Sequence, residues 1–193
     1  MEEPLDEREQ AWLLQLARQS VIAATEGRVL RVPAPSARLC QPAGVFVSLH
    51  KHSLLRGCIG QIHSREPLYR AVIESATSAA LYDPRFPPVS EDELDEVEIE
   101  ISVLSPLTDL DYREAERQIV IGRDGLYVSQ GRNHGVLLPQ VAERFGWDAR
   151  EFLEETCVKA GLSRNAWCSG AHLQKFSAQI FSEKRAGDYS SST

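Results

Sequence analysis

The chain has 193 residues, a length that allows one large domain or two small ones. Its hydrophobic fraction of 42% and charged fraction of 25% are ordinary for a globular protein that can form its own core. The formal net charge is −7 and no run of lysine or arginine interrupts the acidic balance, so a nucleic-acid-binding groove is disfavoured.

The apolar runs, the first residues and the cysteines indicate where the protein is located and whether its thiols are reduced. The longest apolar runs fall short of the roughly 18 residues that a membrane-spanning helix needs, and the first residues are acidic where a signal peptide would be basic. We therefore expect a cytoplasmic protein without a membrane partner. The cysteines at positions 40, 58, 157 and 168 form no C-x-x-C pair, so they are expected to be free thiols, with no zinc site among them.

Two segments in the first half have the spacing of helices that pack on a core. Residues 6–26 repeat apolar side chains at i, i+3, i+4 and i+7, and residues 67–81 begin with proline and are rich in alanine. Between them, residues 45–50 and 54–62 have the composition of strands. A turn at residues 52–53 can join these strands, which predicts a β-hairpin that carries Cys58.

The second half contains one clear strand and then a change of composition. Residues 97–104 alternate strictly between apolar and polar side chains, as in a strand with one buried face. Glu98 and Glu100 lie on its polar face, so we interpret them as solvated side chains and not as a catalytic pair. A short capped helix is expected just before this strand, at residues 90–94.

A block after Pro106 has its own set of expected elements. Three short strands are predicted at residues 119–122, 125–129 and 135–139, followed by helices at residues 140–145, 149–160 and 164–167. Residues 172–183 alternate again and should return to the first sheet.

This order predicts an α+β fold with an inserted part. The larger domain, residues 1–108 and 170–193, would contain both termini and an antiparallel sheet with helices. The smaller subdomain, residues 109–169, would be α+β with a three-stranded sheet.

Most of the residues that could have a catalytic or binding role lie near Cys58. Gly57 and Gly60 permit a positive φ, so the backbone could bend sharply and a ligand could approach the amides of Ile59 and Gly60. Arg56 adds a positive charge that would favour the thiolate if the two side chains converge. The alternative is that Cys58 is a small buried residue and that the glycines only make room for packing.

A second polar segment follows the alanine-rich helix, at residues 83–88. Its prolines end that helix and stiffen a loop that presents Asp83, Arg85 and Phe86. These side chains could face a ligand, or Asp83 and Arg85 could form a local ion pair over a buried Phe86. His50 and His52, together with His63, could suggest a metal site, but exposed histidines at strand ends explain the pattern better and we predict no metal.

Five motifs, in this order and at these separations, resemble the AMMECR domain family, whose prokaryotic members are called protein A of the AmmeMemoRadiSam system. They are LRGCIG, DPRFPP, VEIEISVLSPL, GVLLPQVAERFGW and CVKAGLSRNAW. The resemblance runs from about residue 7 to residue 183 and implies a two-part α+β architecture. It implies no established activity and no cofactor. Genome context associates the family with a Memo-like protein and a radical SAM enzyme, which would be the partners in a modification pathway.

The resemblance implies that nine residues match positions of the family's motifs. They are Arg56, Gly57, Cys58, Gly60, Asp83, Arg85, Phe86, Pro139 and Gln140. Two functions follow as alternatives. In the first, Cys58 is a nucleophile at a cleft between the subdomains, activated by Arg56 or Arg85, with His63, His50 or Asp83 as candidate base and the Ile59 and Gly60 amides as anion donors. In the second, the LRGCIG and DPRFPP loops bind a protein or small molecule without catalysis. RNA binding is a weaker third reading, opposed by the acidic charge.

Overall fold

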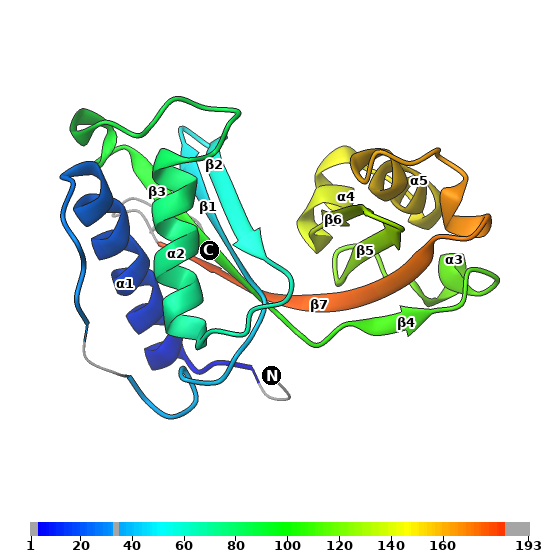
Figure 1. The fold of residues 1–193 in the computed structure, drawn as a ribbon, viewed down its shortest axis with the longest axis horizontal. Helices are drawn as coiled ribbons and strands as arrows, with labels where there is room; N and C mark the ends of the chain where they lie inside the picture. The colour runs from blue at the N-terminus through cyan, green and yellow to red at the C-terminus, as the bar shows by residue number, and fades with distance from the viewer. Residues whose placement is uncertain (1–3, 33–34, 184–193) are drawn as a thin grey trace, which may run out of the picture. The chain divides into compact units, whose positions relative to one another are not determined.

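A computed structural model describes residues 4–32 and 35–183, which form two compact units. The first unit runs to Leu104 and resumes at Gln179, and the second is Ser105–Ala178. The long strand β7 (His172–Ser182) contributes residues to both units (Figure 1). The candidate site belongs to the first unit.

The first unit is a sheet with helices on one face (Figure 1). Its strand order is β2, β1, β3 and then the end of β7, and β1 pairs antiparallel with both β2 and β3. Strand β2 is consequently the edge strand. The elements are α1 (Glu7–Thr25), β1 (Val45–Lys51), β2 (Leu54–Gln61), α2 (Leu68–Leu81), a short 3-10 helix η1 (Glu91–Glu93) and β3 (Val97–Leu104).

Local chemistry explains where these elements begin and turn. Helix α1 starts at a capping box, in which the side chains of Asp6 and Glu9 each accept the other residue's amide. The predicted hairpin is confirmed: His52 and Ser53 form its two-residue turn with φ of 52° and 64°. Positive φ at both positions is the geometry that matches the twist of a two-residue hairpin.

The positive φ expected at the glycines around Cys58 is wrong, because Gly57 and Gly60 lie within strand β2 and neither has a positive φ. A Cβ at Gly57 would stand 2.3 Å from the Ala79 carbonyl oxygen of α2, and one at Gly60 would stand 2.3 Å from the Val45 carbonyl oxygen. The two glycines therefore serve close packing of α2 and β1 on β2. For the glycines, the packing alternative is the correct one.

The second unit has an antiparallel order β4, β7, β5, β6. Its elements are β4 (Thr108–Leu110), α3 (Ala115–Gln118), β5 (Asp124–Gln130), β6 (Asn133–Leu137), α4 (Pro139–Phe145), α5 (Ala149–Lys159) and η2 (Ala166–Cys168). The strand predicted at residues 119–122 is wrong. There the Val120 amide donates to the Asp124 carboxylate at 3.0 Å and the Val120 carbonyl accepts the Asp124 amide at 2.9 Å, which makes a turn.

Sheets and helices in both units make this an α+β fold, as predicted. Each unit has its own apolar core, centred on residues such as Leu13 and Ile101 in the first and Phe152 and Leu153 in the second. In the described part of the chain, no helix combines the length and the apolar character needed to cross a bilayer.

Candidate functional site

Cys58 lies on the free edge of the sheet, and the DPRFPP segment binds its main chain. Asp83 Oδ2 accepts the Cys58 amide at 2.8 Å, and Arg85 Nη2 donates to the Cys58 carbonyl oxygen at 3.1 Å. Along a strand, the amide and carbonyl of one residue face one side, and those of the next residue face the other side. The amide and carbonyl of Cys58 bind Asp83 and Arg85, so they face away from β1. At this residue, Asp83 and Arg85 thus take the place of a neighbouring strand. We call this pair the Asp83–Arg85 clamp.

The clamp is also a strong ion pair. Arg85 Nη2 lies 2.6 Å from Asp83 Oδ2, and Arg85 Nε lies 2.9 Å from Asp83 Oδ1. These hydrogen bonds, helped by the amides of Cys58 and Arg85, lower the pKa of Asp83 to about 2, although burial opposes the shift. The expected Asp83–Arg85 pair is therefore present. Phe86 is only partly buried, and the Arg85 guanidinium lies 5.4 Å from the centre of its ring.

The Cys58 side chain also affects the pKa of Arg85. Hydrogen bonding to Asp83 is the main reason that the pKa of the Arg85 guanidinium is raised, and both charge and hydrogen bonding from the Cys58 side chain add to it. Arg85 therefore hydrogen-bonds to the main chain of Cys58 and interacts electrostatically with its side chain. Of the two arginines considered from the sequence, Arg85 is the one that hydrogen-bonds to Cys58 itself.

Arg56 has a different role. Its guanidinium donates to Glu93 Oε2 at 2.8 Å and to the Pro87 carbonyl at 2.9 Å, and its side chain is only 11% exposed. The hydrogen bond from Arg56 is the main cause that lowers the pKa of Glu93 to about 2. Arg56 thus fastens η1 and the DPRFPP segment to β2. Its guanidinium is directed at Glu93 and the proline carbonyls, and the expectation that it activates Cys58 stays a prediction.

Ser48 supplies a polar contact to the sulfur that the sequence did not predict. Its Oγ donates to Cys58 Sγ at 3.2 Å, and Ser48 is buried while Cys58 is partly exposed. Ser48 pairs with Cys58 on one side and with Glu100 on the other, which places the three residues in one row across the sheet. Because α2 covers Gly57, alternation puts this row on the opposite face.

The remaining predicted residues lie elsewhere. His63 is exposed and follows the end of β2 at Gln61, and the three residue steps from Cys58 to Gln61 alone span about 10 Å. Alternation directs the Ile59 amide into the β1–β2 ladder, so it does not face a ligand at the edge. Gln140 lies in α4 of the second unit.

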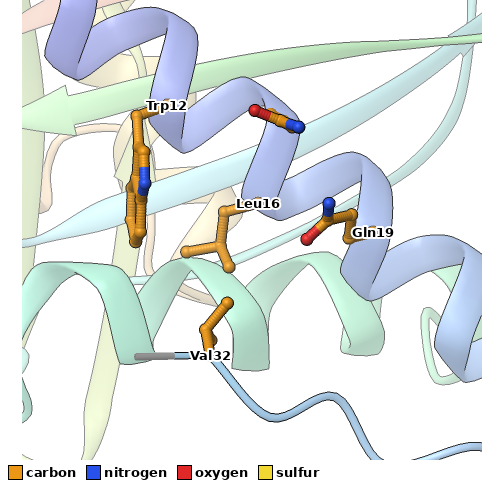
Figure 2. Close-up of a pocket in the computed structure, with 5 residues that line it drawn as sticks. Trp12, Leu16, Gln19 and Val32 are labelled. Atoms are coloured by element: carbon orange, nitrogen blue, oxygen red, sulfur yellow. The ribbon is translucent and has the colours of Figure 1, made fainter. Parts of the chain in front are cut away.

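A cluster of metal-ligating side chains or a pocket would mark a further place for a ligand. Among the described residues, no three His, Cys, Asp or Glu side chains converge as metal ligands would. A pocket of about 160 Å³ opens on α1, where Figure 2 shows Trp12, Leu16 and Gln19 extending from the helix toward Val32. Its lining holds no ionisable side chain and none of the predicted site residues, so it provides no acid–base chemistry.

Comparison with protein families matches residues 14–181 to the AMMECR1 model. The chain belongs to the AMMECR1 family. This finding confirms the resemblance carried by the five motifs. It places Cys58, Asp83 and Arg85 inside the part of the chain that the family shares.

Related AMMECR1 proteins cover nearly the whole chain. Protein MK0488 of Methanopyrus kandleri is 42% identical over 95% of this chain and 93% of its own, and a protein of Methanothermobacter thermautotrophicus is 44% identical over 93% of this chain and 97% of its own. The crystal structure of the uncharacterized protein PH0010 from Pyrococcus horikoshii is similar with a TM-score of 0.85 and 40% identity, and 90% of each chain is covered. None of these three names states an activity.

Proposed function

We propose that Cys58 is the nucleophile of a thiol-dependent enzyme. The observation that supports this proposal is that hydrogen bonds to Asp83 and to the Cys58 carbonyl hold Arg85 at Cys58, where its charge acts on the Cys58 side chain. A positive charge held at a partly exposed sulfur favours the thiolate, which is the reactive form of cysteine. The Ser48 hydroxyl, at 3.2 Å, adds a donor to the same atom.

The proposed step balances without a cofactor. The thiol loses its proton to solvent, and the thiolate sulfur forms a bond to an electrophilic carbon of the substrate. The bond from that carbon to its leaving group breaks, and the leaving group departs with the electron pair. A cytoplasmic setting is part of the proposal, because thiols stay reduced there. A substrate supplied or consumed by a Memo-like protein or a radical SAM enzyme fits the modification pathway that we expected from the family.

A non-catalytic binding module is the second candidate. It is favoured by exposure around the clamp, because Tyr82 is 69% exposed and the Arg85 side chain 51% exposed. In this reading the clamp stiffens a docking surface for a protein or small molecule, and the sulfur is not needed. Replacement Cys58→Ser would then preserve partner binding, whereas it would abolish turnover by an enzyme.

Competition among the protein's own cysteines tests the first candidate. Folded protein is treated with limiting iodoacetamide at pH 7, and peptide mass spectrometry follows each of the four cysteines. We expect Cys58 to react faster than Cys168, although Cys168 is the more exposed of the two. If Cys168 is consumed first while Cys58 stays unmodified, the thiol-enzyme proposal is wrong and the binding module is favoured.

A further inference from the structure

The hydrogen bonds of Arg85 leave one end of its guanidinium available. The group carries five N–H donors. Nε and Nη2 donate to the Asp83 carboxylate, and Nη2 also donates to the Cys58 carbonyl at 3.1 Å. Within the described ranges, the two N–H groups of Nη1 donate to no oxygen atom. These two donors are the part of Arg85 that a ligand could still use.

The available end is both held in place and accessible. The Asp83 carboxylate, the Cys58 carbonyl and the Phe86 ring constrain the guanidinium from three sides. The Arg85 side chain is nevertheless 51% exposed, whereas that of Asp83 is 2% exposed. The negative charge of the ion pair is thus buried and the positive charge faces outward. A donor fixed before binding loses little conformational entropy when a ligand arrives.

Charged N–H donors of this kind suit an anionic oxygen, since charge-assisted hydrogen bonds are shorter and stronger than neutral ones. Arg85 is hydrogen-bonded to the Cys58 carbonyl and interacts electrostatically with the Cys58 side chain, so an anion on Nη1 would be held near the sulfur. We propose that Arg85 Nη1 binds a carboxylate of the substrate whose electrophilic carbon reacts with Cys58. This inference rests on the proposed thiol chemistry and adds the class of substrate.

Two alkylating reagents that differ in charge test it. Iodoacetate is anionic and iodoacetamide is neutral, yet both alkylate a thiol at a CH₂ carbon with loss of iodide. The measured quantity is the ratio of their rate constants at Cys58, iodoacetate over iodoacetamide. We expect Arg85→Gln to lower this ratio about threefold or more, as the loss of one nearby positive charge predicts. In wild type, 0.5 M NaCl should also lower the ratio, because salt screens an exposed charge.

The chain contains a matched control. Arg113 forms the same fork on the aspartate two residues before it, with Arg113 Nη2 2.7 Å from Asp111 Oδ2. Arg113→Gln should leave the ratio at Cys58 unchanged, and Cys168 in the same sample reports any general effect.

The outcomes separate the two proposals. If Cys58 reacts with neither reagent, the thiol-enzyme proposal fails and this inference fails with it. If Cys58 reacts with iodoacetamide but Arg85→Gln leaves the ratio unchanged, only the carboxylate inference is overturned. Should Arg85→Gln not fold, the salt series on wild type decides, and a ratio that does not fall with added salt overturns the inference.

Discussion

The carboxylate of Asp83 accepts the amide of Cys58 at 2.8 Å and thereby completes the edge of a sheet with a side chain. Edge strands normally leave such groups open to solvent or to another chain. Here Arg85 donates to the carbonyl of the same residue, so both polar main-chain groups of Cys58 are hydrogen-bonded at this edge. The residue that carries the sulfur is therefore held at its amide and at its carbonyl.

Replacing Asp83 should weaken the fold. Asp83→Asn removes the charge that pairs with Arg85 and places an amide NH₂ among donors, so we expect the free energy of unfolding to fall by about 1–2 kcal/mol, a value reduced because Arg85 is half exposed. Urea denaturation measures this change. Asp111→Asn is the control, because Asp111 forms the same fork with Arg113 at an exposed site. Equal effects of the two substitutions would contradict a structural role for the clamp.

Acid should weaken the clamp in a defined range. The folded pKa of Asp83 is about 2 and lies below its usual value of 3.8, so its stabilising contribution is full above about pH 4 and is lost as the pH falls toward 2. Glu93 behaves in the same way, with a pKa of about 2. Urea midpoints between pH 5 and pH 2.5 should therefore fall less steeply for Asp83→Asn than for wild type. Parallel curves would show that the carboxylate is not stabilised in the folded state.

A side chain at Gly57 should be poorly tolerated. The added Cβ of Gly57→Ala would lie 2.3 Å from a main-chain oxygen of α2, which cannot rotate away. We expect a loss of about 2 kcal/mol or more in the free energy of unfolding, as for other overpacked sites. Gly131→Asn serves as the control, because Gly131 has open space around it and a φ of 63° that asparagine tolerates. Similar stability of both variants would argue against close packing of α2 on β2.

Removal of the Ser48 hydroxyl should affect the sulfur more than the fold. Ser48→Ala deletes the donor at 3.2 Å from Cys58 Sγ, so we expect iodoacetamide to modify Cys58 about fivefold more slowly at pH 7, corresponding to about 1 kcal/mol for one hydrogen bond. Ser102→Ala is the control on the neighbouring row, where Ser102 pairs with Phe46. An unchanged rate in Ser48→Ala would remove Ser48 from the site.

Periodicity was sufficient to predict most of the elements. The strict alternation of residues 97–104 fixed β3 to its ends, and the two-residue turn at His52 and Ser53 fixed the hairpin. Periodicity alone does not give the partner of Ser48. Counting back from the Lys51–Leu54 pair puts Ser48 opposite Gly57, but an irregularity in the pairing beyond Leu49 shifts Ser48 to Cys58. A local bulge of this kind depends on tertiary packing and has no clear sequence signal.

Sequence alone also could not show which arginine, Arg56 or Arg85, binds Cys58. Arg56 is two residues from Cys58 in sequence and was the natural candidate, whereas Arg85 is separated by a whole helix. Glu93 and the proline carbonyls bind Arg56, while Asp83 turns Arg85 back to Cys58. Which guanidinium binds Cys58 is decided by carboxylates, Asp83 and Glu93, that lie far from Cys58 in the chain. Proximity in sequence could not supply that information.

The central claim is that the fold activates the sulfur of Cys58. The most direct measurement is the second-order rate constant of iodoacetamide with Cys58 at pH 7, in a protein where Cys40, Cys157 and Cys168 are replaced by serine or alanine, compared with glutathione under the same conditions. Activation predicts that Cys58 reacts faster than glutathione in spite of its partial burial. A rate well below that of glutathione, in protein shown to be folded, would contradict the claim.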